Sequence, residues 1–238
     1  MTHPYWPLFD LRLSVGEVEL RPMTEADQLP LAALLPDDVE LDPAATRYPG
    51  LDKAATRRVI SFQHYWSSYG SWRPEHWKLP FCVRLGGELV GAQELEAEDF
   101  PLLRTVDSAS HLVPQFRGRG IGQQMRRAVL ALAFGPLRAQ AAISSAWHDN
   151  YASLAVSRAL GYRPNGESLH PRDGGVDTLQ HLRLRRSDWL AGDGGAGVLI
   201  EGVEACWPYF GLAADGTAST PEHPAGTPSA EGTRAGRE

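Results

Sequence analysis

The stretch that decides the fold of this chain is Gln115-Phe116-Arg117-Gly118-Arg119-Gly120-Ile121-Gly122, which lies between a strand-like run and a helix-like run. Its three glycines let the backbone turn tightly and leave the N–H groups uncovered by side chains. The next helix points the positive end of its dipole into this loop, and Arg117 and Arg119 add two guanidinium groups. The octamer therefore predicts a cradle for a phosphate group. A glycine-rich turn with exposed arginines is the alternative that the octamer alone leaves open.

The spacing of the glycines separates this loop from the commoner phosphate-binding loops. A Walker loop requires Lys and then Ser or Thr after its last glycine, and Gln123-Gln124 stands there instead. A dinucleotide fingerprint requires a later third glycine. The octamer matches Q/R-x-x-G-x-G/A and resembles the acyl-CoA pyrophosphate loop of the GNAT superfamily of N-acyltransferases. The resemblance implies that CoA is contacted by Gln115, Arg117, Gly118, Arg119, Gly120, Ile121 and Gly122.

Hydrophobic periodicity places further elements around the loop. Alternating or apolar runs predict strands at residues 11–15, 18–22, 79–85, 88–95, 105–113, 141–147 and 178–184. Helical spacing predicts helices after Thr24 and at residues 58–69, 122–134 and 153–160. A turn is expected at residues 162–166, and the last strand is expected to continue through residues 185–189. This order predicts an α/β (α+β) fold, with a mixed, mostly antiparallel central sheet flanked by helices, and it is the element order of the GNAT fold.

A second motif follows the loop. Residues 148–162 resemble the GNAT segment in which an Asn precedes a short helix that ends in Leu-Gly-Phe or Leu-Gly-Tyr. The Asn-x-x-Ser start and the segment at residues 18–22 are most similar to the RimJ/RimL-like branch. The resemblance implies that Asn150 contacts the pantetheine arm and that Ser153 lies near the cofactor. The same residues are also typical of a helix N-cap and a supported first helical turn.

Composition sets limits on the function. The 238 residues, 42% of them apolar, suffice for one well-buried catalytic domain with appendages, and the net charge of −6 argues against a nucleic-acid binder. Cys82 and Cys206 lack the spacing of a disulfide framework or a zinc site, so no metal is expected. Residues 1–10 have no signal-peptide pattern, and no apolar run reaches about 18 residues. We expect a soluble, cytoplasmic protein without a membrane partner.

The resemblance covers residues 11–190, which we expect to form the N-acyltransferase domain. Residues 1–10 form an aromatic extension in this prediction, and residues 191–212 form a flexible linker with an aromatic docking segment. The composition of residues 213–238 predicts a disordered tail. W-P-x-F-x-L occurs at residues 6–11 and again at residues 207–212, and we expect the two copies to dock side by side in one molecule or across a homodimer.

Acyl transfer to an amine requires donors for an oxyanion and a proton for the departing thiolate. The family's sheet splays open beside the acyl group, so the resemblance implies backbone N–H donors at Leu112 and Val113. Many members place a Tyr four residues before the Gly of Leu-Gly-Phe, where this chain has Ser157. Ser157 is the candidate proton donor. A hydrogen bond to a carbonyl one turn back is its structural alternative, and Tyr162 is a second donor candidate.

The amine must also lose a proton. Asp107 falls where the RimJ/RimL-like strand carries an acid, and His111 lies on the same strand face because side chains alternate. His111 is the better base candidate near neutral pH, since an ordinary His titrates near pH 6.5. Glu94, Glu96 and Asp99 are alternatives, and so is deprotonation through water without one essential base.

The acceptor is less clearly indicated. Six aromatic residues gather in residues 63–81, which suits a wall for a planar or apolar acceptor, or core packing. Four acidic residues precede them and suit either a cationic amine or a solvated loop: Asp37, Asp38, Glu40 and Asp42.

The resemblance implies an N-acyltransferase in which a primary amine of a small molecule or a protein N-terminus attacks acetyl-CoA, or another short acyl-CoA, in a ternary complex. Succinyl-CoA is a possible donor, because acyl choice depends on the shape of the pocket around the thioester. Ser157 in place of Tyr keeps a second hypothesis open, a non-catalytic acyl-CoA sensor or interaction module.

Overall fold

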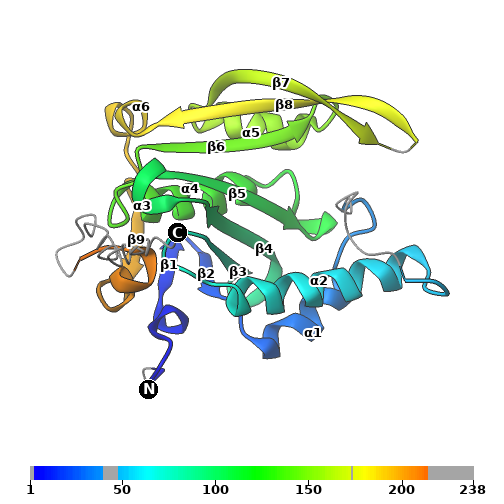
Figure 1. The fold of residues 1–238 in the computed structure, drawn as a ribbon, viewed down its shortest axis with the longest axis horizontal. Coiled ribbons are helices and arrows are strands. Elements are labelled where there is room, and N and C mark those ends of the chain that lie inside the picture. The colour runs from blue at the N-terminus through cyan, green and yellow to red at the C-terminus, as the bar shows by residue number, and fades with distance from the viewer. Residues whose placement is uncertain (1–2, 40–47, 173, 214–238) are drawn as a thin grey trace, which may run out of the picture.

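The computed structural model describes residues 3–39, 48–172 and 174–213, and the expected tail and the acidic residues Glu40 and Asp42 lie outside these ranges. One nine-stranded sheet runs through it in the order β7-β8-β6-β5-β4-β3-β2-β1-β9 (Figure 1). The strands are β1 (Arg12–Val15), β2 (Val18–Pro22), β3 (Trp77–Leu85), β4 (Glu88–Ala97), β5 (Thr105–Leu112), β6 (Ala141–Trp147), β7 (Arg163–Arg172), β8 (Gly175–Arg185) and β9 (Val198–Glu201).

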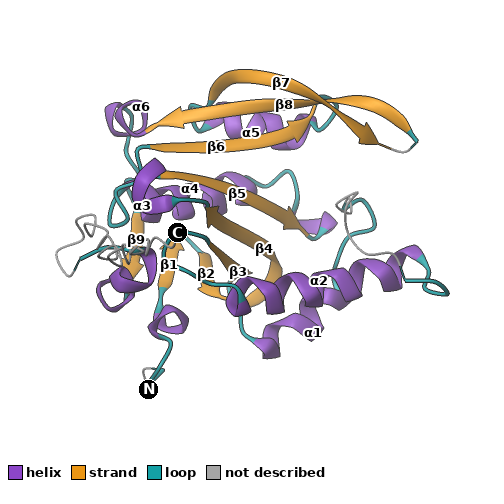
Figure 2. Ribbon diagram, viewed as in Figure 1, coloured by secondary structure: helices purple, strands orange, loops and turns teal. Residues whose placement is uncertain are grey.

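Helices cover the sheet and connect its strands (Figure 2). The α-helices are α1 (Glu25–Ala33), α2 (Lys53–Gly70), α3 (Phe100–Leu103), α4 (Ile121–Phe134), α5 (Tyr151–Ala159) and α6 (Arg186–Ala191). Short 3-10 helices are η1 (Pro7–Asp10), η2 (Pro114–Phe116) and η3 (Glu204–Phe210). In the described parts of the chain, none of the helices combines the length and apolar character that crossing a membrane would require.

The described sheet has one parallel junction, between its third and fourth strands, β6 and β5. All other neighbouring strands pair antiparallel, as the sequence predicted, whereas β5 and β6 run parallel. These two strands pair only at Thr105 with Ala141 and at Val106 with Ala142. Beyond these two pairs they diverge, and Figure 1 shows the separation widening along both strands. The predicted mixed, mostly antiparallel and splayed GNAT-type sheet is confirmed.

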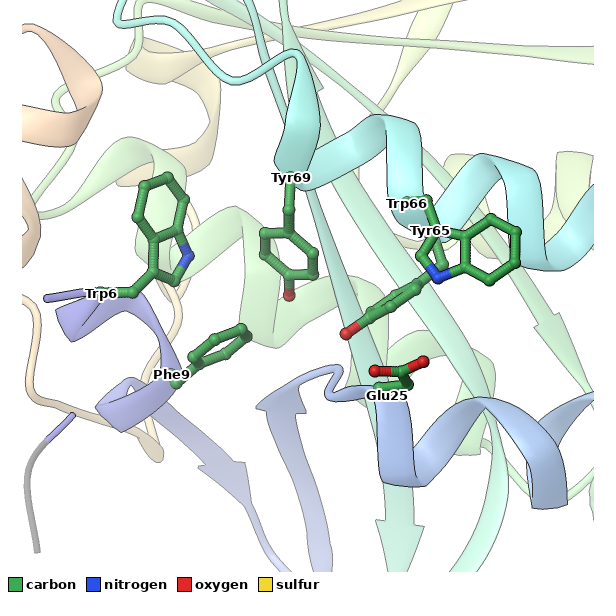
Figure 3. A pocket seen from close by; sticks show the side chains of 6 residues that line it. All are labelled: Trp6, Phe9, Glu25, Tyr65, Trp66 and Tyr69. Atoms are coloured by element: carbon green, nitrogen blue, oxygen red, sulfur yellow. The ribbon is translucent and has the colours of Figure 1, made fainter.

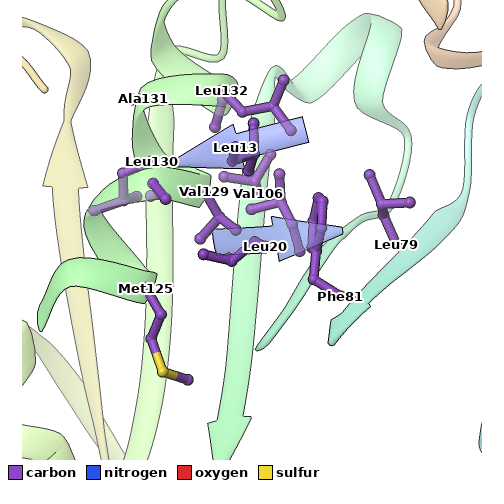
Figure 4. Close-up of a cluster of buried hydrophobic side chains, with 14 of the residues drawn as sticks. Leu13, Leu20, Leu79, Phe81, Val106, Met125, Val129, Leu130, Ala131 and Leu132 are labelled. Atoms are coloured by element: carbon purple, nitrogen blue, oxygen red, sulfur yellow. The ribbon is translucent and has the colours of Figure 1, made fainter. Parts of the chain in front are cut away.

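The main core lies between α4 and one face of the sheet. Met125, Val129 and Leu132 of α4 are at most 1% exposed. They belong to one buried cluster with Leu20, Val106 and other side chains of the strands, shown in Figure 4. Because Val106 points toward α4, the alternation of β5 places Asp107 and its same-face neighbours on the opposite side of the sheet. The helix that follows the glycine loop is therefore anchored by burial along its length.

The second half of the chain differs from the sequence prediction in two places. Residues 163–172 form β7 instead of a turn, because Gly166 (φ +100°) and a register shift let the strand pass Pro164 while it pairs with β8. Residues 186–191 form helix α6 instead of continuing β8. Trp189 of that helix is 6% exposed and lies against Phe134, with ring centroids 5.8 Å apart. Tertiary packing thus overrides the local turn and strand signals.

The terminal segments join the domain. The expected linker contains β9, which pairs antiparallel with β1 and extends the sheet by one strand. The two W-P-x-F-x-L copies lie side by side in one molecule: the Trp6 and Tyr209 rings are 5.1 Å apart, and Tyr209 donates to the Tyr5 carbonyl over 3.1 Å. Leu8 and Phe210 are fully buried. Packing of the two copies within one chain therefore accounts for the repeated W-P-x-F-x-L motif without a second subunit.

Candidate active site

The glycine loop leads from β5 into α4 with its backbone amides uncovered. Gly118 (φ +71°) and Gly120 (φ +79°) adopt conformations that favour glycine, and a Cβ at either position would meet nothing within 4 Å. Gly120 is the N-cap of α4 and has no side chain to cap the first turn. The N–H groups of Gln123 and Gln124 donate to the Gly120 carbonyl, so those of Ile121 and Gly122 are left for a ligand at the positive end of the helix dipole. This geometry suits a phosphate group.

The two predicted guanidinium groups are held differently. Arg117 contacts both carboxylate oxygens of Asp38, with its Nη1 and Nη2 atoms at 2.5 and 2.8 Å, and its Nε donates to the Leu112 carbonyl over 3.0 Å. The hydrogen bond from Arg117 lowers the pKa of Asp38. Arg119 lies over the Phe116 ring at 5.5 Å. A phosphate at the loop would therefore compete with Asp38 for Arg117.

The end of β5 presents one backbone amide to the splay. Val113, one of the two predicted donors, donates its N–H to the Val90 carbonyl of β4 over 2.9 Å, so this amide is already used. Hydrogen-bonding direction alternates along an antiparallel strand, so the N–H of Leu112 points away from β4, toward β6. No strand pairs with β5 at Leu112 on that side within the described residues. Leu112 thus keeps the predicted geometry of an oxyanion donor, and Val113 does not.

Polar side chains gather where β5 and β6 separate. Ser108 and Ser144 each come two residues after the last paired positions of their strands. Arg126 of α4, 3% exposed, donates to Ser144 Oγ over 3.2 Å. Burial raises the pKa of the Tyr162 phenol, and the nearby Arg126 guanidinium acts in the opposite direction. A guanidinium, a phenol and two hydroxyls therefore occupy the base of the splay.

Several atoms at this place lack partners. Within residues 3–39, 48–172 and 174–213, no hydrogen bond of good geometry reaches the buried atoms Ser108 Oγ, Ser157 Oγ, the Tyr162 hydroxyl oxygen and Arg126 Nε, although Ser108 and Arg126 lie close enough to the phenol to lower its pKa. Buried polar groups are nearly always hydrogen-bonded in native proteins, so a bound molecule is a natural source of partners. Ser157 is fully buried and does not make the expected bond to a carbonyl one turn back. Sequence reasoning overlooked Arg126, because an Arg on a helix is usually solvated.

The second motif starts α5. Asn150 is the N-cap, and its Oδ1 accepts the Ser153 N–H over 3.1 Å. Asn150 therefore has the N-cap role that the sequence also suggested. A contact of Asn150 or Ser153 with a cofactor stays a prediction.

The opposite face of β5 carries the two predicted bases. Asp107 and His111 lie on one face, four residues or about 13 Å apart along the strand, too far to act as a hydrogen-bonded pair. Burial lowers the pKa of His111 to about 4, and its Nε2 has no partner among the described residues. The ordinary pKa assumed for His111 was therefore wrong. Burial raises the pKa of Asp107 to about 6, while its Oδ1 accepts the Ser108 N–H over 2.6 Å.

A pair that joins the sheet to α2 lies between these two positions. Glu94 is opposite Ala109 in the β4–β5 register and therefore shares the face of Asp107 and His111. Its Oε2 is 2.5 Å from Nε2 of His64, and this hydrogen bond raises the pKa of His64. Glu94 was an alternative base in the sequence. Sequence reasoning did not single out His64 within residues 63–81, because nothing local links residues 30 positions apart.

Asp107 allows a direct test of the electrostatics of this face. Its raised pKa means that the folded protein holds the proton more tightly than the unfolded chain, so stability falls as pH rises from about 4 through about 6. We expect Asp107→Asn to raise the free energy of unfolding at pH 8 by up to about 3 kcal/mol and to change it little at pH 4. Urea unfolding at both pH values measures the difference. Equal effects at the two pH values would contradict the raised pKa.

One group of potential metal ligands lies near the start of α5. Ligand atoms of His148, Asp149 and Asp177 all lie within 4.8 Å of one another. Arg172 Nη1 already donates to both carboxylates, over 2.8 and 2.7 Å. A guanidinium thus takes the place that a cation would need.

The splayed strands, the uncapped glycine loop and the buried polar groups match one family of enzymes. The model of the acetyltransferase (GNAT) domain matches residues 17–163, more than half of the chain. This chain belongs to the GNAT acetyltransferase family. The matched residues of this GNAT domain include α2, the splay, the glycine loop and α5, whereas η1, α6, β9 and η3 lie outside them.

Solved structures share the fold of this GNAT domain. Mycobacterium smegmatis RimJ in complex with CoA-disulfide has a TM-score of 0.59 and 20% identity, covering 78% of this chain and 95% of that one. RimL, a ribosomal L7/L12 alpha-N-protein acetyltransferase in complex with coenzyme A, has a TM-score of 0.56 and 18% identity, covering 73% and 97%. A spermidine N-acetyltransferase SpeG chimera from Vibrio cholerae and hSSAT has a TM-score of 0.55 and 15% identity, covering 74% and 99%. At these identities the likeness shows the fold alone.

Proposed function

We propose that this GNAT-family enzyme transfers a short acyl group, acetyl in the first place, from its CoA thioester to a primary amine that attacks directly. The observation that carries the proposal is the divergence of β5 and β6 beside the uncapped N-terminus of α4. It exposes a free amide at Leu112 and a phosphate cradle at the open end of the splay, and it leaves unpartnered buried hydroxyls in the domain. CoA is long, has an anionic pyrophosphate and carries amides along its arm, so it fits these groups.

Each part of the site has a different task in binding CoA. The N–H groups of residues 118–122 and the guanidinium of Arg119 would hold the pyrophosphate, with Arg117 joining once Asp38 releases it. Gln115, Asn150 and Ser153 remain proposed contacts of the cofactor. The thioester supplies an activated acyl carbonyl, and the Leu112 N–H is oriented to donate to its oxygen. In this proposal the acyl carbonyl lies beside Leu112, where β5 ends and the splay is open.

Amine deprotonation is assigned to the His64–Glu94 pair. A neutral imidazole accepts the amine proton, and the adjacent carboxylate stabilises the imidazolium that results, consistent with the raised pKa of His64. Asp107 is a second candidate with a pKa near 6, at the base of the splay. His111 is a weaker candidate, because a buried imidazole with a pKa of about 4 holds a proton poorly.

Proton donation to the departing thiolate is assigned to Ser157 or Tyr162. Both hydroxyls are buried, and neither makes a hydrogen bond of good geometry in the described structure. The phenol is the stronger acid of the two, although burial raises its pKa. Arg126, buried next to the Tyr162 hydroxyl, opposes that rise and helps the phenol to release its proton.

The donor and the acceptor can be tested together. Purified protein is incubated with acetyl-CoA or succinyl-CoA and a panel of polyamines, small amines and peptides with free N-termini, and free thiol is followed. The panel suits the chain because a spermidine acetyltransferase and an N-terminal protein acetyltransferase share its fold. Amine-dependent thiol release supports the proposal. CoA binding by calorimetry without turnover on any amine favours the sensor, and absence of CoA binding rejects both hypotheses.

A further inference from the structure

A pocket of about 330 Å³ opens between η1, the start of α1 and α2, apart from the splay. Neither β5, β6 nor the glycine loop contributes a residue to its lining. Figure 3 shows the side chains that line it: Trp6, Phe9, Glu25, Tyr65, Trp66 and Tyr69. Its volume lies at the lower end of the range of small-molecule sites, about 300–1,000 Å³. Five of the six residues are aromatic, and no Lys or Arg is among them.

The rings form walls in different planes. Tyr69 is at the centre, and its ring makes interplanar angles of 83° with Trp6, 62° with Phe9 and 77° with Tyr65, at centroid distances of 6.3, 5.2 and 5.4 Å. Trp66 stands at the outer side of the pocket in Figure 3 and is 55% exposed. The negative face of an aromatic ring attracts a cation, and several rings around one space add their effects.

Among the described residues, Glu25 is the one charged residue that lines the pocket, and its charge is negative. Glu25 is exposed at its edge and forms no ion pair with any residue that the structure describes. Burial raises the pKa of the Tyr65 phenol, and the Glu25 carboxylate adds to this effect, so its field reaches into the pocket. A purely apolar ligand would leave this carboxylate without a role.

We propose that this pocket is a binding site for an organic ammonium ion, such as a methylated amine, held by the aromatic faces and by the carboxylate of Glu25. None of the residues that line the pocket has a role in the proposed acyl transfer, so this inference does not depend on the proposed function. Trp6 and Phe9 lie before residues 17–163, the part matched by the family model, so the extension supplies two walls that the matched domain lacks. The docking of Trp6 on Tyr209 holds that extension in place.

The test compares choline with 3,3-dimethyl-1-butanol, which has the same shape without the charge. The quaternary nitrogen carries no proton, so choline cannot serve as an N-acyl acceptor. We expect calorimetry on the full chain to show choline binding with a Kd of about 1 mM or tighter and the neutral isostere at least about 10-fold weaker. Comparable affinity for the two compounds, or no choline binding up to about 50 mM, overturns the proposal.

Two matched pairs of variants locate the bound ion. Glu25→Gln and Phe9→Leu are each expected to weaken choline binding at least about 5-fold, because one removes the charge and the other a ring face. Glu17→Gln and Tyr5→Leu are the controls, since these exposed residues do not line the pocket. Thermal unfolding confirms that each variant is folded. Choline affinity unchanged in both folded pocket variants places the ion elsewhere and overturns the proposal.

Discussion

Gly120→Trp is expected to lower the affinity for CoA at least about 100-fold, because the change blocks the amides of α4 and strains the loop. Gly120 has φ +79°, where an L side chain is unfavourable, and it is the N-cap whose missing side chain leaves the first turn open. An indole there would cover the N–H groups and the positive end of the helix dipole. Isothermal titration with CoA measures the loss.

A second glycine provides the control for backbone strain. Gly50 has φ +86°, and its Cβ direction is as open as that of Gly120, but it lies in the turn before α2. Gly50→Trp should therefore carry a similar conformational cost while CoA affinity stays within about 3-fold of the original. Equal losses in the two variants, or full CoA affinity in a folded Gly120→Trp protein, would contradict the assignment of the loop.

His64→Gln is expected to lower kcat about 100-fold near neutral pH, with CoA affinity unchanged, since it removes the proposed proton acceptor. The pair also predicts the shape of the pH profile. The hydrogen bond from Glu94 raises the pKa of His64, so activity should rise with pH through an inflection above the ordinary value of 6.5. Glu94→Gln should lower kcat and move that inflection to lower pH, because the imidazolium loses its carboxylate. Steady-state rates across pH measure both effects.

Two residues on the same face control this experiment. Glu96 carries the same charge but is paired with Lys78 at 2.7 Å, and His111 carries the same ring but is buried, with a pKa of about 4. His111→Gln should keep the inflection of the original enzyme. Glu96→Gln should move it less than Glu94→Gln does, because Glu96 makes no hydrogen bond to His64 and raises its pKa only through its charge. If the inflection is lost in His111→Gln and kept in His64→Gln, the base is His111, as the sequence analysis predicted, and not His64.

Much of the fold could be read from local patterns. The hairpin at Gly86-Gly87, the strand at residues 141–147 and helix α4 follow from periodicity and from glycines with positive φ, such as +56° and +89° in that hairpin. The sequence prediction of secondary structure is wrong where contacts between distant residues determine the conformation. Strand β7 passes Pro164 because β8 pairs with it, and β9 forms directly after a glycine-rich stretch because β1 has a free edge.

The candidate site likewise contains parts that depend on local sequence and parts that depend on distant contacts. The glycine loop and the Asn150 cap are runs of consecutive residues whose conformations depend on their own backbone, so the sequence by itself determined the CoA-binding class. Only the tertiary structure decided which groups are available for the proposed proton transfers. It paired His64 with Glu94 and Arg117 with Asp38, and it used the Val113 amide in the sheet. It also enclosed Nε2 of His111, whose pKa desolvation lowers to about 4. Desolvation and charge partners set a pKa, and both come from residues far apart in the chain.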